Sequence, residues 1–353
     1  MPCEHVFVRW DNLRIESDQG RTLPGYSDPA TVRTFDAPEA LATRFYEVRA
    51  KSALNRVPKQ SRMFFRWTIN PYRGCSHACV TCFARPTHNF LDFNARGDFD
   101  REIVVKVNAP EVLRAELRKP SWKREHVALG TNTDPYQWVE GRYELMRGIW
   151  QALLDYGTPC SVLTKSPLVL RDLDLLIRLR DGPGVTASFS IPTLDEKAWR
   201  ATEPRTPNPR ARLEAMKALA EAGIPTSVLV APLIPGINDS PEQVEEIVAL
   251  CDEAGAQSIG GIALHLRGEV KEIWFDWLRS KRPDLLPLYE RLYARGAYAP
   301  AAVRQEMADR METARGKLDR KPPAFARRPD PAGPPHVEER AKPEPEVEQT
   351  ALF

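Results

Sequence analysis

The sequence has few of the residues that build a disulfide framework or a membrane span. Only six of its 353 residues are cysteine, and three of these, Cys3, Cys160 and Cys251, stand apart from one another. Unpaired cysteine is among the most frequently buried residue types, so we interpret these three as small core residues. No run of about 18 apolar residues occurs, and the sequence therefore predicts no transmembrane helix.

A targeting segment and a strong charge bias are missing as well. The first residues, Met1 to His5, show no basic stretch followed by an apolar one, so we expect no secretory signal and a cytoplasmic location. Lysine and arginine together number 50, against 48 for aspartate and glutamate. This balance neither requires nor excludes a nucleic-acid partner, because a nearly neutral protein can still carry a local basic groove.

Short apolar runs alternate with longer segments of helical spacing over most of the chain. Strands alternating with helices indicate parallel βαβ units. Six such units are too few to close an eight-stranded TIM barrel, so the predicted fold class is α/β, a partial (β/α)6 TIM-like barrel with its active site at the carboxyl ends of the strands. The predicted strands are Phe64–Ile69, His126–Leu129, Cys160–Leu163, Val185–Ile191, Thr226–Val230 and Ser258–Leu264, and the predicted helices are Tyr143–Leu154, Asp172–Arg180, Pro209–Ala222 and Ser240–Ala254.

Three further segments flank this predicted core barrel at residues 61–268. Residues 1–60 contain turn signals and are expected to form an N-terminal extension that wraps the core. The aromatic-rich stretch at 269–320 predicts a C-terminal helical region that packs on the barrel. Residues 321–353 are rich in proline and charge and poor in apolar side chains, a composition that predicts a disordered tail.

Three cysteines crowd into one short segment directly after the first predicted strand. Cys75, Cys79 and Cys82 have the spacing C-x₃-C-x₂-C and are followed by the aromatic Phe83. Thiolates suit iron–sulfur chemistry, and three of them on one loop can hold three irons of a [4Fe–4S] cluster. The fourth iron then lacks a protein ligand and is open to a ligand from outside.

Two other kinds of metal site compete with this interpretation. A structural zinc site has four ligands, usually as two separated pairs. His77 is a candidate fourth ligand, but its place inside the tight loop argues against it. A cluster with a purely structural or electron-transfer role usually has four cysteines, and no fourth lies nearby in the sequence. The spacing therefore favours an open cluster.

The segment Asn70–Leu91, with its C-x₃-C-x₂-C-aromatic motif, resembles the radical S-adenosylmethionine (SAM) superfamily. Residues 45–310 are similar to one branch of it, the spore-photoproduct-lyase-like proteins often described as DNA repair photolyases. The resemblance implies a [4Fe–4S] cluster held by Cys75, Cys79 and Cys82, with SAM as the second cofactor. It also implies a lyase-like enzyme that cleaves SAM reductively to a 5′-deoxyadenosyl radical, with an electron donor such as flavodoxin or ferredoxin as partner.

The resemblance further implies which residues bind SAM, most of them at or after the ends of predicted strands. The loop after the second strand supplies acceptors for the SAM amino group, and the lysine after the third strand pairs with the SAM carboxylate. The serine of the fourth strand contacts the ribose or the amino acid moiety, the arginine of the helix after it clamps a carboxylate, and the backbone of the fifth strand lines the adenine. The residues concerned are Phe83, Thr131, Asn132, Asp134, Lys165, Ser190, Arg212 and Ile234.

Ordinary structural roles are the alternatives for these residues. The stretch from Thr131 to Asp134 also fits an Asx-rich turn before a helix. Lys165 fits a lysine whose stem lies along the barrel rim while its charge reaches water, and Arg212 fits a surface arginine paired with a glutamate. His265, at the end of the sixth strand, is a catalytic candidate, although a lone histidine there is more often structural.

One part of the lyase pattern is missing. The spore photoproduct lyases return a hydrogen atom from a cysteine near the end of the second strand, whereas this chain has no cysteine between Cys82 and Cys160. Tyr72, Tyr136 or Cys160 are the alternatives that the sequence offers. The leading hypothesis is a radical SAM enzyme that acts on nucleic acid, as in DNA repair. The alternatives are a radical SAM enzyme that modifies a protein, peptide or small molecule, and a non-catalytic iron–sulfur interaction module.

The last five residues resemble the short peptide by which bacterial replication and repair proteins dock on the DNA sliding clamp. Gln349, Leu352 and Phe353 match the fixed positions of that peptide. Two large apolar side chains at the end of a polar tail suit a hydrophobic pocket on a partner. Chance is the alternative, because only three positions are fixed. The sliding clamp is therefore a candidate partner.

Overall fold

The main sheet contains six parallel strands, which confirms the predicted partial barrel. A computed structural model of the protein describes residues 18–320 except 22, 36–41, 59–60 and 62. The sheet has the order β12-β11-β10-β9-β8-β5-β4, with β4 antiparallel to β5 at one edge. Its strands are β4 (Leu54–Arg56), β5 (Trp67–Ile69), β8 (Val127–Leu129), β9 (Cys160–Thr164), β10 (Val185–Ser190), β11 (Thr226–Leu233) and β12 (Ser258–Ala263). The six parallel ones correspond to the six predicted strands.

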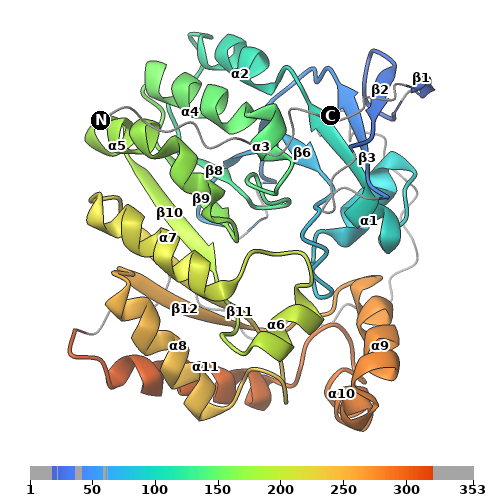
Figure 1. Ribbon diagram of the computed structural model, residues 1–353, viewed down its shortest axis with the longest axis vertical. Helices are drawn as coiled ribbons and strands as arrows, with labels where there is room; N and C mark the ends of the chain where they lie inside the picture. Colours follow the sequence, from blue (N-terminus) through green and yellow to red (C-terminus); the bar gives the residue numbers. More distant parts are fainter. Residues whose placement is uncertain (1–17, 22, 36–41, 59–60, 62, 321–353) are drawn as a thin grey trace.

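Helices connect the successive parallel strands and cover one face of the sheet (Figure 1). Their buried side chains, such as Trp150, Met216 and Val248, form one continuous apolar core with the strands. Burial of this apolar face, rather than helix propensity, holds each helix in place. The four predicted helices are present as α4 (Leu145–Asp155), α5 (Leu173–Asp181), α7 (Pro209–Glu221) and α8 (Pro241–Glu253).

A second sheet, which the sequence analysis did not predict, joins the N-terminal segment to the barrel. It has the order β1-β2-β3-β7-β6. In it, β3 runs parallel to β7, and β7 pairs antiparallel with β6, which ends two residues before Cys75. Strand pairing with distant residues therefore fixes the start of the cysteine loop. The strands are β1 (Asp18–Arg21), β2 (Ala30–Arg33), β3 (Arg44–Val48), β6 (Tyr72–Arg73) and β7 (Glu102–Lys106).

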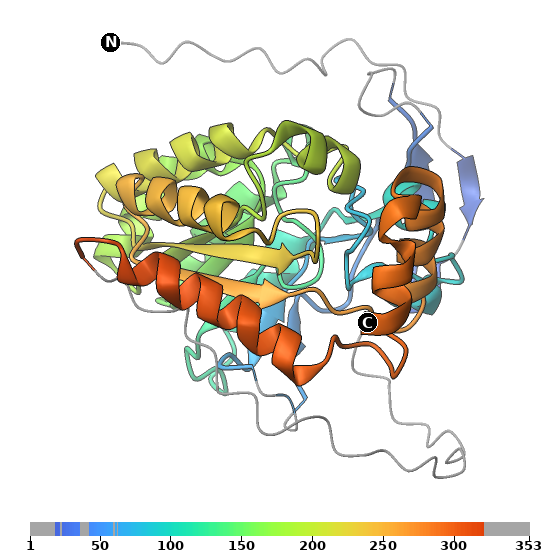
Figure 2. The same ribbon diagram turned by 90° about the horizontal axis from the view of Figure 1, so that it is seen from below.

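The C-terminal part of the described chain is helical, as expected. α9 (Val270–Lys281) and α10 (Leu286–Leu292) pack together through a tilted contact between the rings of Trp274 and Tyr289, while α11 (Ala301–Gly316) packs along α8 and β12 (Figure 2). None of the helices in the described part of the chain combines the length and apolarity of a membrane span. The remaining elements are α1 (Gly97–Arg101), α2 (Ala109–Leu117), α3 (Glu140–Tyr143), α6 (Glu196–Thr202), and the 3-10 helices η1 (Arg85–Leu91), η2 (Pro167–Asp172) and η3 (Pro283–Leu285).

Gly130, directly after β8, is required by the close approach of β8 and β9. Its φ of +79° lies in the left-handed region that favours glycine. A Cβ atom at this position would lie 1.9 Å from the carbonyl oxygen of Leu163 in the neighbouring strand. Both the backbone conformation and the lack of space therefore exclude a side chain where the loop to the active site begins.

Replacing this glycine should destabilise the protein strongly. We expect Gly130→Ala to lower the free energy of unfolding by about 3 kcal/mol, the sum of left-handed strain and overpacking. Urea denaturation followed by circular dichroism measures this change. Gly97→Ala is the matched control, since a Cβ there meets nothing within 4 Å. Equal unfolding midpoints for the two variants would contradict the explanation.

Candidate active site

A cavity of about 230 Å³ lies at the carboxyl ends of the parallel strands. Its wall combines the cysteine loop with residues near or after the carboxyl ends of β8, β9, β10, β11 and β12, so the barrel brings together groups that are far apart in the sequence. Most of the predicted site residues belong to this wall. Its members include Cys75, His77, Cys79, Cys82, Phe83, Asn132, Asp134, Lys165, Ser190, Glu203, Ala231, Pro232 and His265.

The cysteine loop is held by two buried side chains that the sequence analysis did not single out. Gln137 donates from its amide nitrogen to the carbonyl of Gly74 at 3.2 Å and accepts from the amide of Ser76 at 2.9 Å. Arg85 donates to the carbonyl of Cys79 at 3.0 Å. These contacts are made to main-chain groups, so the residue types in the sequence gave no signal for them. The loop is therefore preorganised by the protein itself.

The three cysteines of the loop fit an iron–sulfur site by the chemistry of their donors. All three line the cavity, with Cys75 buried and the other two partly exposed. Burial raises the pKa of each thiol, so binding of iron has to displace protons. Within the described ranges, no three histidine, cysteine or acidic side chains are grouped to hold one metal ion. In a cluster, by contrast, each thiolate binds an iron of its own.

Asp134 connects three of the loops that form the wall. One of its carboxylate oxygens accepts hydrogen bonds from the Thr164 hydroxyl at 2.7 Å and the Tyr136 amide at 2.9 Å. The other accepts from the Lys165 amide at 2.7 Å and lies 3.4 Å from Nδ1 of His77. Burial lowers the pKa of His77, so the ring faces this carboxylate in its neutral form. The chain's own donors thus engage both oxygens of Asp134.

An ion-pair chain lies at the wall of the cavity beside the end of β10. The ammonium of Lys165 is 2.7 Å from one oxygen of Glu203 and also donates to the hydroxyl of Ser190, while Arg212 lies 2.9 Å from the other Glu203 oxygen. Burial alone would raise the pKa of Glu203, but the two cations outweigh it and lower this pKa to about 2. Two cations share one carboxylate, so the Lys165 ammonium, which lines the cavity, is not fully neutralised by Glu203 alone and can also contact an anion.

Arg212 lies deeper in the protein than the sequence suggested, and Glu203 has a role that the sequence did not indicate. Arg212 is fully buried and does not line the cavity; its guanidinium donates to the carbonyls of Ser190 at 2.9 Å and Pro207 at 3.0 Å. It contacts the cavity wall through Ser190 and through Glu203, which the sequence analysis did not name as a site residue. The contact between Glu203 and Lys165 forms only when the chain after β10 returns to the strand ends, so no local pattern predicts it.

Thr131 and Ile234 lie outside this wall. Thr131 lines a second cavity next to the first. The amide of Ile234 donates to Oδ1 of Asn238 at 2.6 Å, and its carbonyl accepts from the amide of Ile237 at 3.0 Å, so the turn itself uses both backbone groups. From the same strand, Ala231 and Pro232 line the cavity instead.

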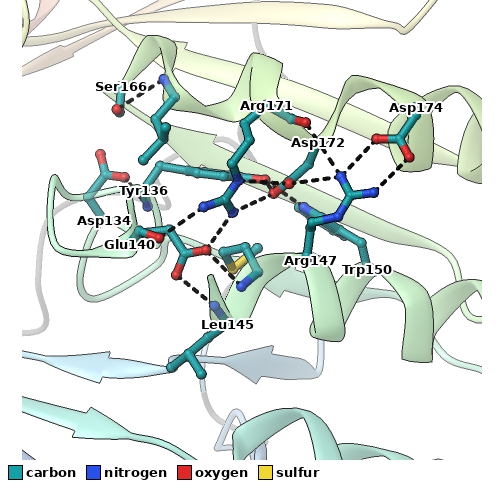
Figure 3. Close-up of polar contacts among 12 residues, drawn as sticks. Asp134, Tyr136, Glu140, Leu145, Arg147, Trp150, Ser166, Arg171, Asp172 and Asp174 are labelled. Carbon is teal, nitrogen blue, oxygen red and sulfur yellow. Dashed lines mark hydrogen bonds and ion pairs between the residues drawn. The ribbon is translucent and has the colours of Figure 1, made fainter. Parts of the chain in front are cut away.

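The alternative hydrogen-atom donors do not line the cavity. The hydroxyl of Tyr72 donates to Glu140, and that of Tyr136 donates to Asp172 at 2.8 Å; both rings are fully buried. Cys160 is buried at the amino end of β9, opposite the site. Figure 3 shows the Tyr136 hydroxyl inside a buried polar network.

This network fixes the loop after β8 to the neighbouring helices. Arg171 lies 2.6 Å from Glu140 and 2.9 Å from Asp172, and the indole of Trp150 donates to the Tyr136 hydroxyl at 2.6 Å (Figure 3). Burial raises the pKa of Glu140 to about 7 even though Arg171 opposes the shift. The polar groups satisfy one another, so their role is to position the loop that carries Asp134.

Comparison with known proteins decides between the kinds of metal site. Residues 69–251 match the model of the Radical SAM superfamily. The chain belongs to this superfamily. Its cofactors are therefore a [4Fe–4S] cluster and SAM, and the donor set of the cavity fits them. The cluster, when bound and reduced, supplies the electron that cleaves SAM. The open-cluster prediction is confirmed at the level of the family.

Relatives in sequence and structure support the assignment. An uncharacterized protein of Mycobacterium tuberculosis is 46% identical over 289 residues, which cover 82% of this chain and 85% of that protein. The radical SAM Nalpha-GlyT isomerase of Pseudomonas phage M6 is 28% identical over 170 residues, or 47% of this chain and 33% of the isomerase. Spore photoproduct lyase complexed with dinucleoside spore photoproduct is similar in fold, with a TM-score of 0.56 at 18% identity, covering 76% of this chain and 78% of the lyase.

Removing the carboxylate between the two cations should destabilise the protein in a pH-dependent way. Glu203→Gln leaves Arg212 and Lys165 without their counter-charge, and we expect a loss of about 3 kcal/mol in the free energy of unfolding at neutral pH. The folded-state pKa of Glu203, about 2, lies below its ordinary 4.5. The stabilisation is therefore present above pH 4.5 and disappears as the pH falls towards 2.

Urea denaturation of wild type and Glu203→Gln across this pH range measures the effect, and the difference between them should shrink with acidification. Glu196→Gln is the control, because Glu196 pairs with Arg200 on the surface and should contribute under about 1 kcal/mol. A difference that stayed constant with pH would show that the charge of Glu203 is not what stabilises the site.

Proposed function

We propose that this protein is a radical SAM enzyme that acts on nucleic acid, in a DNA repair-like reaction on a modified or damaged base. The observation that carries the proposal is the surroundings of the cofactor cavity. Through Phe83 and Asn132 it adjoins a larger cavity whose described lining has three cationic side chains and no carboxylate. A phosphate-bearing substrate is favoured by such a surface. The dinucleoside bound by spore photoproduct lyase, which has the same fold, agrees with this choice.

In this proposal the residues of the cavity have separate roles. Cys75, Cys79 and Cys82 hold the cluster. Lys165, assisted by Ser190, binds the SAM carboxylate, since its ammonium lines the cavity and donates to the Ser190 hydroxyl there. Asn132 and Phe83 lie between cofactor and substrate, and Ala231 and Pro232 provide the apolar surface for the adenine.

Asp134 and Arg212 are positioning residues in this proposal. Asp134 holds the amide of Lys165, and Arg212 holds Glu203, which in turn orients the Lys165 ammonium. Removing either one would change the geometry of the SAM site without removing a direct contact to SAM. Thr131 belongs to the substrate side of the wall, and Ile234 supports the strand end behind it.

The reaction we propose is a cleavage or rearrangement that takes no hydrogen atom from the protein. Among the described residues that line the cofactor cavity there is no tyrosine and no cysteine besides the three of the loop. The name of the phage relative, an isomerase, is compatible with this class of reaction. The enzyme we propose is cytoplasmic and receives electrons from a flavodoxin or ferredoxin. The candidate clamp peptide, Gln349, Leu352 and Phe353, lies outside the described residues and stays a prediction.

The proposed SAM contact can be tested by Lys165→Ala. Loss of a charge-assisted hydrogen bond of about 1.5–3 kcal/mol should weaken SAM binding about tenfold or more while the iron content stays unchanged. Equilibrium dialysis with labelled SAM measures the affinity, and iron analysis checks the cluster. Lys217→Ala, on the exposed face of α7, is the charge-matched control. Unchanged SAM affinity would remove Lys165 from the site.

The substrate class can be tested with the reduced, reconstituted enzyme. We expect the enzyme to change the photoproducts of ultraviolet-irradiated DNA, which liquid chromatography of the digested DNA separates, and this DNA to increase the formation of 5′-deoxyadenosine. A mixture of peptides should not increase it. Cys79→Ala should lose iron and all turnover, and Cys251→Ala, a buried cysteine away from the cavity, should keep both. Turnover with peptides and none with DNA would favour a peptide-modifying enzyme instead. Full iron without any cleavage of SAM would favour a non-catalytic module.

A further inference from the structure

A second cavity, of about 420 Å³, lies beside the cofactor cavity. The two share Phe83 and Asn132, so these side chains form part of the partition between the cavities. The cavity is formed where β4 and β5 of the main sheet meet β6 and β7 of the second sheet. Its lining includes Asn55, Arg56, Met63, Phe65, Thr68, Asn70, Arg73, Phe83, Thr87, Phe90, Lys106, Thr131 and Asn132.

The charge of this cavity is of one sign. Arg56, Arg73 and Lys106 line it, and its described lining contains no aspartate or glutamate. Lys106 is only 7% exposed, and its ammonium makes no hydrogen bond or ion pair with any described residue. Burial and the charge of Arg73 lower the pKa of Lys106 to about 8, while the charge of Glu116 opposes the shift. A buried cation without a counter-ion is unfavourable unless a ligand supplies one.

Large apolar side chains that are strongly exposed gather at the second cavity. Four large apolar side chains of the described chain are strongly exposed, and three of them, Met63, Phe83 and Phe90, line this cavity. Exposed aromatic rings next to cationic side chains are the surface on which nucleic-acid bases stack. Scattered over the molecule such residues would mean little, but gathered around one opening they indicate a binding site.

A buried polar atom points to the same kind of ligand. The side-chain oxygen Oδ1 of Asn70, in the lining, has no hydrogen-bond partner among the residues that the structure describes. A carboxamide oxygen accepts hydrogen bonds, and the edge of a pyrimidine or purine base supplies N–H donors. Cations, aromatic rings and an unused acceptor therefore coincide, and they match the phosphate, the base face and the base edge of a nucleotide.

We propose that the second cavity binds the nucleotide adjacent to the one that reacts, with its phosphodiester at Lys106 and Arg56 and its base between Phe83 and Phe90. The inference rests on the proposed function and extends it, because it assigns a separate subsite to the flanking nucleotide. The reacting nucleotide then extends past Phe83 and Asn132 into the cofactor cavity. Specificity for a dinucleotide unit follows from the two cavities being neighbours.

The experiment compares two probes that differ in one charge. One is the thymidine dinucleotide with its normal phosphodiester, and the other is the same dinucleotide with a neutral methylphosphonate link. Calorimetric titration of the protein should show that the phosphodiester binds about tenfold more tightly. Lys106→Gln should bring the two affinities close to equal, and Phe90→Ala should weaken both probes to a similar extent. Lys217→Gln, which removes a distant surface charge, should retain the full preference.

If Lys106→Gln fails to fold, Arg56→Gln provides the same comparison from an exposed position. A wild-type preference that persists in both variants would overturn the subsite, even if the enzyme still acts on DNA. Failure of the wild type to bind either probe, together with turnover on peptides, would instead overturn the proposed function. The two failures are therefore distinguishable.

Discussion

The carboxylate of Asp134 is the point on which the geometry of the active site depends. It is anchored to Thr164 and to the amide of Lys165 at the end of β9, and it faces His77 in the cysteine loop. A displacement of any one of these segments would also displace the others, because all of them contact this one carboxylate. The barrel holds the strand ends at a fixed spacing. The contacts of Asp134 then fix the position of the cysteine loop relative to Lys165.

The segment between α6 and α7 supports the same site from the other side. The amide of Val80 in the cysteine loop donates to the carbonyl of Thr202 at 2.9 Å, and the amide of Arg205 donates to the carbonyl of His77 at 3.3 Å. Glu203 lies between these two contacts and pairs with Lys165. One short stretch thus supports both the sulfur ligands and the ammonium group, which explains why its single acidic side chain is so well buried.

The parallel strands and the cysteine motif could be predicted because their signals are local. A buried strand is a short apolar run, and a cluster loop is a spacing of residue types. The second sheet was not predictable in this way, since β6 has only two residues and owes its existence to pairing with β7. The same limit applies within the site. Lys165 stands at the end of a strand and was identifiable, whereas Glu203 acquires its role only through a contact across the barrel.

The position of Phe83 has a consequence for how the two cavities communicate. This ring follows Cys82 directly and forms part of the partition between them. A ligand that moves the main chain of Phe83 from one side would also move the neighbouring main chain of Cys82 on the other. Occupancy of one cavity and the energetics of the other are then thermodynamically linked, and such linkage is reciprocal. A partition built in this way can couple the two cavities as well as separate them.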